Sequence, residues 1–211
     1  MEGRTMMVAL PKYLYYMAPV TPNAQLILCN GIKPRNLVSG LIPGVRSLAD
    51  PGVIRLRAKK TIHGVPLHNY VPLYWATHTP MQHNILQNGI VGRDDLVFFV
   101  CDSAEVLSML GVLTTDGNAA SDSTQFWTGE GASSAIDWRV VAPPNAYSAE
   151  YRRKKMAEVL VPNCVPPECF VQVIVHCERT RQALMAMGSA TAGHPIHSRP
   201  KVEVKIDQSL Y

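Results

Sequence analysis

One carboxylate, Glu158, stands in the apolar, strand-like run Met156-Ala157-Glu158-Val159-Leu160-Val161, directly after a basic cluster at positions 152–155 (Arg-Arg-Lys-Lys). A carboxylate beside a basic surface can stabilise a cationic reaction centre while its basic neighbours hold a polyanion. The alternative is structural, because most glutamates near a basic run are solvated and form weak ion pairs, here with Lys154 or Lys155. These residues alone leave both interpretations open.

A second basic cluster, Arg55-Leu56-Arg57-Ala58-Lys59-Lys60, lies in the first third of the chain. Clustered cations neutralise phosphates and release counterions, although they can equally form solvated edges. The formal net charge of +4 is too small to identify a nucleic-acid-binding protein by itself. The clusters therefore indicate a phosphate-containing ligand without distinguishing DNA, RNA and a dinucleotide.

The composition predicts one folded domain over residues 1–211, since 47% of the residues are hydrophobic and only 17% are charged. The five cysteines include no CxxC pair, so we interpret them as reduced thiols and expect no metal site. His194 and His197 are interpreted as loop residues. No signal-peptide pattern and no apolar run long enough to cross a membrane is present, so we expect a cytoplasmic protein without a membrane partner.

These residues must be positioned by short strands and helices. A helix is predicted over 23–32, stopped by Asn30-Gly31. Strands are predicted by β-branched and aromatic runs at 53–56, 71–75, 96–101, 159–161, 170–175 and 202–206. Further helices are predicted at 81–87, 103–110, 149–155 and 179–187. Few of the connections between predicted strands contain a long helix, and several strands alternate apolar with polar residues, as in a half-exposed sheet. The pattern therefore favours α+β over a doubly wound parallel sheet.

Prolines and glycines punctuate residues 33–52, which predicts an irregular, mobile loop of the kind that often binds ligands. Several common sites are excluded by their motifs, since the chain has no GxGxxG, no GxxxxGK[ST] and no GxSxG.

Five blocks of sequence, in this order, resemble the DarT family of NAD-dependent DNA ADP-ribosyltransferase toxins. They are NAQLILCNGI (23–32), LHNYVPLYW (67–75), TPM (79–81), TDGNAA (115–120) and AEVLV (157–161). The resemblance covers roughly residues 13–206, and the LHNYVPLY block followed by Pro80-Met81 is its most specific part. It implies an ADP-ribosyltransferase-like α+β fold, with a central, mainly antiparallel, split sheet flanked by helices.

The resemblance also implies site residues. Glu158 corresponds to the catalytic glutamate, Arg57 to the NAD-anchoring and catalytic arginine, and Asn23 to an asparagine that contacts NAD. Tyr74 and Met81 either line the nicotinamide site or fill the core. The family usually carries a histidine-threonine pair before the asparagine block; this chain has Tyr15-Tyr16 there, so Tyr16 can keep a stacking contact with NAD but not the imidazole hydrogen bond. Contacts to the nucleic acid are expected from Asn118, Arg152, Arg153 and Lys154.

The implied activity is the transfer of ADP-ribose from NAD to a base of single-stranded DNA, by a toxin whose partner is a DarG-like macrodomain antitoxin. We expect a monomer. One alternative is the same chemistry on RNA or protein, and another is a non-enzymatic nucleic-acid-binding module in which Glu158 only pairs with a neighbouring lysine.

Overall fold

The computed structural model describes residues 10–38, 45–128, 134–143, 148–190 and 202–211. Within these ranges eight strands form one sheet in the order β10-β9-β5-β1-β4-β8-β6-β7, and β2 and β3 form a separate hairpin. The strands are β1 (Tyr13–Pro19), β2 (Thr61–Ile62), β3 (Val65–Pro66), β4 (Tyr70–Tyr74), β5 (Leu96–Asp102), β6 (Leu113–Thr115), β7 (Phe126–Thr128), β8 (Glu158–Pro162), β9 (Phe170–Val175) and β10 (Glu203–Ile206). All neighbouring pairs in the large sheet are antiparallel except β9 and β10.

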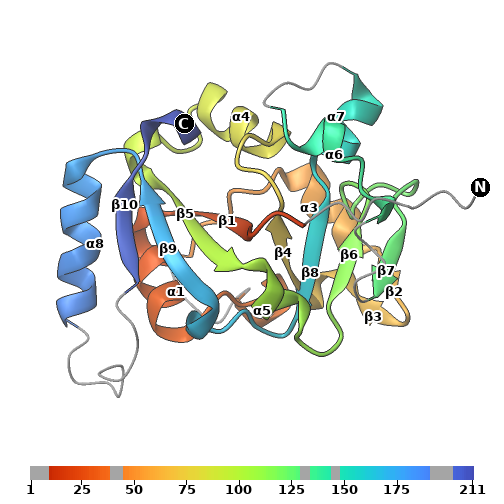
Figure 1. The fold of residues 1–211 in the computed structure, drawn as a ribbon, viewed down its shortest axis with the longest axis horizontal. Helices are drawn as coiled ribbons and strands as arrows, with labels where there is room; N and C mark the ends of the chain where they lie inside the picture. Colours follow the sequence, from red (N-terminus) through yellow and green to blue (C-terminus); the bar gives the residue numbers. More distant parts are fainter. Residues whose placement is uncertain (1–9, 39–44, 129–133, 144–147, 191–201) are drawn as a thin grey trace, which may run out of the picture.

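The helices lie around this sheet, with α8 outside the β9–β10 edge and α6 and α7 near its β8 half (Figure 1). Their bounds are α1 (Gln25–Asn30), α2 (Arg35–Val38), α3 (Pro51–Ala58), α4 (Pro80–Gln87), α5 (Ser103–Leu107), α6 (Trp138–Val141), α7 (Ala149–Lys155) and α8 (Glu178–Ala190). Shorter helical turns are η1 (Val20–Ala24), η2 (Leu67–Asn69), η3 (Arg93–Asp95), η5 (Pro167–Cys169) and η7 (Gln208–Leu210).

The sheet separates into two halves between its central strands. The pairing of β1 with β4 is recorded at one position, Tyr15 opposite Tyr74, whereas β1 pairs with β5 along seven residues. Strand β4 continues on its other side into an uninterrupted ladder with β8. The divergence of β1 and β4 opens space between two otherwise well-paired halves.

Both faces of the central strands are buried, which explains their continuous apolar sequences. In β5, Val97 and Phe99 belong to the largest core cluster together with Val159 and Val173. Leu96, Phe98 and Val100 point to the opposite face. At least six buried large side chains on such faces contribute ~1.5–3 kcal/mol each, so the strands form a stiff frame for the polar groups at their ends.

The α+β, mainly antiparallel architecture is confirmed, as are the strands expected at 71–75, 96–101, 159–161, 170–175 and 202–206, to within one residue at each end. The helices expected at 81–87, 149–155 and 179–187 are also present, and helix α1 ends at Asn30 as expected. Gly31 has φ +77°, and a Cβ there would lie 2.4 Å from the carbonyl oxygen of Val165, so only glycine fits this helix end.

The strand predicted at 53–56 is wrong, because these residues form part of α3. Asp50 caps this helix by accepting hydrogen bonds from the backbone N–H groups of Gly52 (2.6 Å) and Val53 (3.2 Å), and Pro51 occupies the first turn. These local start signals outweigh the β-branched pair Val53-Ile54. The helix predicted over 103–110 ends earlier, at Leu107.

The segment 33–52 is not irregular throughout, since it contains α2 and the start of α3. Residues 39–44 lie outside the described part of the chain, as do His194 and His197, and the mobility of the segment stays a prediction. Strands β1, β6 and β7, the β2–β3 hairpin and helices α2 and α6 were not predicted.

Candidate active site

A cavity of about 600 Å³ lies where β1 and β4 diverge. Tyr16 and Met17 of β1 and Tyr70 and Tyr74 of β4 form part of its wall, and the segments 33–35 and 45–54 form another part. Its volume is within the range of ~300–1,000 Å³ typical of ligand sites. The split of the sheet therefore produces a site large enough for a small organic ligand.

Two charges meet on the wall of this cavity. Glu158 is fully buried, and its Oε2 lies 2.9 Å from Nη1 of Arg57, which also lies 3.2 Å from Oε1. Glu158 is the first residue of β8, opposite Tyr74 of β4. Arg57 reaches it from the last turn of α3, whose helical twist turns Arg57 inward while Arg55 and Lys59 remain exposed. The two residues predicted to be catalytic are thus in direct contact.

Further hydrogen bonds hold Glu158 in place. The backbone N–H of Ala119 donates to Oε1 at 3.1 Å, and the N–H of Glu158 donates to the hydroxyl of Thr115 at 2.8 Å. Burial lowers the pKa of Arg57, but the charge of Glu158, the nearby Tyr74 and the hydrogen bond to Glu158 together raise it by more. The pKa therefore lies above its ordinary value, and the guanidinium stays charged. The site therefore holds a fixed carboxylate beside a permanent cation.

The interpretation that Glu158 is exposed and pairs with Lys154 or Lys155 is wrong. Lys154 pairs with Asp137 at 3.5 Å, and the buried Lys155 donates to the carbonyl oxygens of Val141 and Pro143 at the end of α6. These partners lie in and around α6, outside the cluster, and two of them are backbone carbonyls. Counting nearby charges therefore suggested a different pairing.

Aromatic and thioether groups complete the wall. The hydroxyl of Tyr74 lies 3.6 Å from Sδ of Met81, and both residues line the cavity. Tyr74 also packs in the core. Lining the cavity and filling the core, which the sequence left as alternatives for Tyr74, are thus combined in one side chain. Burial, with a contribution from Glu158, raises the pKa of Tyr74, and burial raises that of Tyr16. Both tyrosines therefore keep neutral hydroxyl groups at pH 7.

Asn23 lines the cavity, but its side chain is hydrogen-bonded to the backbone of the segment 45–50. Its Nδ2 donates to the carbonyl oxygen of Arg46 at 2.9 Å, and its Oδ1 accepts from the N–H of Arg46 at 3.1 Å. The two polar atoms of this amide thus hold the segment 45–50, which forms part of the cavity wall, against the turn that precedes α1.

Several further residues line the cavity that were not predicted from the sequence, among them Lys33, Arg35, Arg46 and His68. The basic lining residues are Lys33, Arg35, Arg46 and Arg57, against the acidic Asp50 and Glu158. His68 also lines the cavity, and its buried Nε2 has no hydrogen-bond partner among the described residues. Burial, and to a smaller extent the charges of Arg57 and Arg35, lower the pKa of His68, so its ring is neutral at pH 7. The only sequence signal that could have indicated His68 was its place in the LHNYVPLY block. The cavity as a whole favours a ligand with negative charge.

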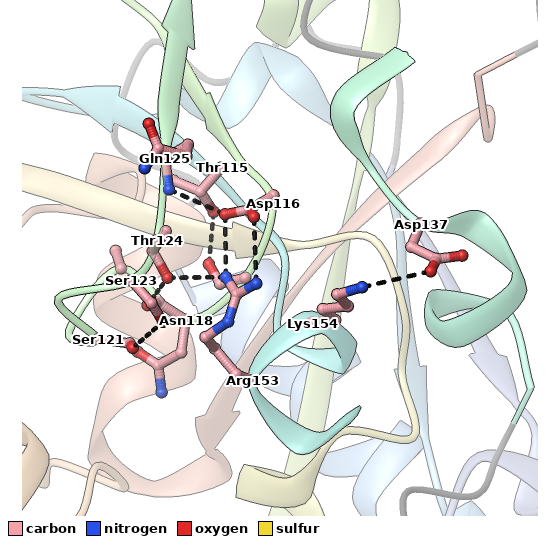
Figure 2. Close-up of polar contacts among 12 residues, drawn as sticks. Thr115, Asp116, Asn118, Ser121, Ser123, Thr124, Gln125, Asp137, Arg153 and Lys154 are labelled. Atoms are coloured by element: carbon pink, nitrogen blue, oxygen red, sulfur yellow. Dashed lines mark hydrogen bonds and ion pairs between the residues drawn. The ribbon is translucent and has the colours of Figure 1, made fainter. Parts of the chain in front are cut away.

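Asn118, in the turn between β6 and β7, lines the cavity. Figure 2 shows the polar contacts between this turn and Arg153. The Oδ1 of Asn118 accepts from the N–H of Ala120 at 2.9 Å, and its Nδ2 lies 3.8 Å from Sδ of Met156. Of the basic cluster 152–155, Arg153 contacts the same turn through Asp116 and Thr124, while Arg152 is exposed. Asn118 is therefore near the Arg57–Glu158 pair, and the four basic residues have different environments.

Among the described residues, no three His, Cys, Asp or Glu side chains are grouped so that they could ligate a metal ion. Nor does this part of the chain contain a helix with the length and apolar character needed to cross a bilayer.

Solved structures of similar fold come from two bacteria. The protein superposes on Thermus sp. 2.9 DarT in complex with ADP-ribosylated ssDNA with a TM-score of 0.83, at 20% identity, over 95% of this chain and 96% of the other. For Thermosipho africanus DarTG in complex with ADP-ribose the TM-score is 0.75, at 22% identity, over 94% of this chain and 50% of the other. These likenesses establish a shared fold.

Curated relatives agree with the structural matches. A DNA ADP-ribosyl transferase of Thermus sp. is 24% identical over 173 residues, covering 78% of this chain and 81% of the relative. A Thermosipho africanus DNA ADP-ribosyl transferase-DNA ADP-ribosyl glycohydrolase fusion protein is 26% identical over 165 residues, 77% of this chain, but the chain spans only 42% of its length. The family profile described as "ssDNA thymidine ADP-ribosyltransferase, DarT" matches residues 16–211. With this match over nearly its whole length, the chain belongs to the DarT family.

Proposed function

We propose that the protein transfers ADP-ribose from NAD to the base of thymidine in single-stranded DNA and releases nicotinamide. The observation that carries the proposal is the buried Arg57–Glu158 pair on the wall of a cavity, in a chain that belongs to the DarT family. The family description supports thymidine as the modified nucleoside.

Glu158 supplies the charge that the reaction needs. Cleavage of the nicotinamide N-glycosidic bond develops oxocarbenium-like positive charge on the ribose, and a fixed carboxylate in a water-poor site stabilises that charge. The hydrogen bond from Ala119 and the contact with Arg57 hold the Glu158 carboxylate without further reorganisation. Glu158 is therefore the proposed catalytic residue.

Arg57 and the other basic groups of the cavity hold the pyrophosphate of NAD. A guanidinium presents planar N–H donors that match phosphate oxygens, and the basic lining residues outnumber the acidic ones. Tyr16, Tyr74 and Met81 supply apolar surface for the nicotinamide end, and Asn23 acts on NAD by holding the segment 45–50. This division leaves nicotinamide as the leaving group next to Glu158.

The acceptor base must reach the same cavity. A base in single-stranded DNA is unstacked at little cost, whereas a duplex would have to be opened. The amide of Asn118 at the rim suits a hydrogen bond to a thymine carbonyl, and the exposed Arg152 suits a phosphate contact.

Labelled NAD tests the proposal directly. The protein is incubated with a thymidine-containing single-stranded oligonucleotide, the same oligonucleotide lacking thymidine, its duplex form, RNA and a protein pool. We expect label only on the first substrate, as an ADP-ribosylated thymidine identified by nucleoside mass spectrometry, and loss of label with Glu158→Gln. Label on RNA or protein alone, or on the oligonucleotide lacking thymidine, would reject the assignment.

The biological context follows from the same activity. The Thermosipho africanus relative joins a transferase to a glycohydrolase, so we propose that this protein is a toxin countered by a DarG-like macrodomain glycohydrolase. It acts as a monomer in the cytoplasm, where NAD and exposed DNA strands are available. Addition of such a glycohydrolase to the labelled oligonucleotide is expected to release the label; label that persists would reject this partner.

A further inference from the structure

We propose that Arg153 is a positioning residue that holds the turn 116–125 and thereby the base-facing amide of Asn118, instead of binding DNA phosphates. The inference rests on the proposed function, because it concerns how the acceptor base meets the catalytic carboxylate. It assigns different roles to the adjacent arginines 152 and 153.

All the N–H groups of the Arg153 guanidinium already have protein acceptors. Its Nε and Nη2 donate to the two oxygens of Glu150 at 2.9 and 2.8 Å, and Nη1 and Nη2 donate to the two oxygens of Asp116 at 3.0 and 3.1 Å. Nη1 also donates to the hydroxyl of Thr124 at 3.2 Å. A guanidinium has five N–H donors, so none is left for a phosphate. Two carboxylates around one cation also make this position repel a polyanion.

The same contacts tie both ends of the turn to α7 (Figure 2). Asp116 stands at its start and also accepts from the N–H of Gln125 at 2.9 Å, while Thr124 donates to the carbonyl oxygen of Asn118 at 2.7 Å. The N–H of Asn118 in turn donates to the carbonyl oxygen of Arg153 at 2.9 Å. Arg153 is therefore joined to Asn118 directly through the backbone and indirectly through Thr124.

The turn also sets where Asn118 lies relative to Glu158. Ala119, the next residue, donates its N–H to Glu158 Oε1 at 3.1 Å. Because Asn118 Oδ1 accepts from Ala120, its Nδ2 is the amide group directed to Met156 and the cavity. A thymine carbonyl oxygen accepts from such a donor. If the contacts of Arg153 were lost, the turn would shift, and the Asn118 amide would move relative to the ribose carbon that reacts.

Two neighbouring variants form a matched test, Arg153→Gln and Arg152→Gln. The dissociation constant for a thymidine-containing single strand is measured as a function of salt, together with kcat for transfer at saturating DNA. Loss of one phosphate contact lowers the salt slope by about 0.7 for a single strand. We expect this reduction for Arg152→Gln. For Arg153→Gln we expect an unchanged slope, a kcat for transfer at least tenfold lower, and an unchanged dissociation constant for NAD.

Asp116→Asn breaks the same contact from the turn and remains informative if Arg153→Gln does not fold. It is expected to lower kcat like Arg153→Gln; if Arg153 instead bound phosphate, freeing it from Asp116 would tighten DNA binding and raise the salt slope. Arg153→Lys should not restore kcat, because an ammonium cannot form the bidentate contacts.

A further readout separates positioning from general damage. NAD cleaved without DNA acceptor yields free ADP-ribose, so the fraction of cleaved NAD that is transferred to DNA should fall in Arg153→Gln. An equal loss of cleavage and transfer, or a reduced salt slope with unchanged kcat, would overturn the positioning role. Absence of transfer by the unmodified protein would instead reject the proposed function.

Discussion

Removal of either charge of the Arg57–Glu158 pair is expected to destabilise the protein more than removal of both. At the observed 2.9 Å separation, the attraction between unit charges is about 6 kcal/mol at an effective dielectric constant of ~20. Glu158 is fully buried and the Arg57 side chain is only 10% exposed, so a remaining partner would lose this attraction without regaining full hydration. Removing one partner of a buried pair costs ~3–5 kcal/mol, and we expect about 3 kcal/mol here because the cavity admits solvent to one side.

The assay is a double-mutant cycle by urea unfolding at pH 7, with Arg57→Met, Glu158→Gln and the double variant. Glutamine keeps an acceptor for the N–H of Ala119, so the cycle reports mainly on charge. Replacing both members of a buried pair is often neutral, and we expect the double variant to be more stable than either single variant, with a coupling energy of roughly 2–3 kcal/mol. All three should lose transfer activity, Glu158→Gln by at least ~100-fold, a loss typical of removing an electrostatic stabiliser.

Activity and stability therefore separate in the double variant, which should be folded and inactive. Single-variant losses that add to within about 0.5 kcal/mol would refute the coupling. So would a Glu158→Gln protein as stable as the unmodified one, because it would mean that Arg57 is well hydrated.

Three further perturbations probe the surroundings of the pair. In Gly117→Ala the added Cβ would lie 2.4 Å from Nη1 and 2.9 Å from the carbonyl oxygen of Arg153, and we expect a loss of ~1–3 kcal/mol in urea unfolding; an unchanged stability would contradict the close packing. Asn23→Ala removes two hydrogen bonds to Arg46, worth ~0.5–1.5 kcal/mol each, so calorimetry should give roughly 5- to 150-fold weaker NAD binding, with Asn23→Asp intermediate. Unchanged affinity would show that Asn23 does not hold the cavity wall. Burial lowers the pKa of Lys155 from its ordinary 10.5 to about 8. Between these values the unfolded chain binds more protons there, so this residue makes the unfolding free energy rise with pH, and Lys155→Met should lose that rise; identical pH dependence of the two proteins would contradict it.

The strands were predictable where one signal dominated. Residues 96–101 and 170–175 are β-branched or aromatic runs between turn signals. The first run forms a central strand buried on both faces, and the second forms the neighbouring strand β9, in which Val171 stays exposed. Residues 53–56 had competing signals, a β-branched pair following an Asp-Pro helix start. The capped helix formed, and it is the helix that directs Arg57 into the cavity. The wrong prediction for this element thus concerned the position of Arg57, a residue of the proposed active site.

The members of the site were more predictable than their contacts. Arg57 and Glu158 could be singled out, but they are 101 positions apart and meet only because α3 packs beside the start of β8. Similarly, Asn23 belongs to the predicted NAD site, yet its amide contacts the backbone of Arg46. Residue type and resemblance to a family can predict which residues belong to the site. Their hydrogen-bond partners depend on tertiary packing and could not be predicted in this way.

The basic cluster 152–155 illustrates why charge runs overestimate phosphate contacts. Arg153 and Lys154 have acidic partners, and Lys155 is buried against carbonyl oxygens. Arg153 pairs with Glu150, three residues away, but the other acids lie outside the cluster, Asp116 in the β6–β7 turn and Asp137 before α6. A sequence window around the cluster contains neither of them, so its apparent charge exceeds the charge available to DNA.

The cavity wall and the Arg57 guanidinium are parts of one continuous structure. Asn23 holds the backbone at Arg46, a few residues later Asp50 caps α3, and Arg57 lies at the other end of that helix. A movement of the segment 45–50 would therefore shift the start of α3 and, with it, Arg57 relative to Glu158. Because α3 has only eight residues, about two turns, such a movement has little helix over which to be absorbed. NAD held against this segment would thus act on the geometry of the charged pair as well as on its own binding.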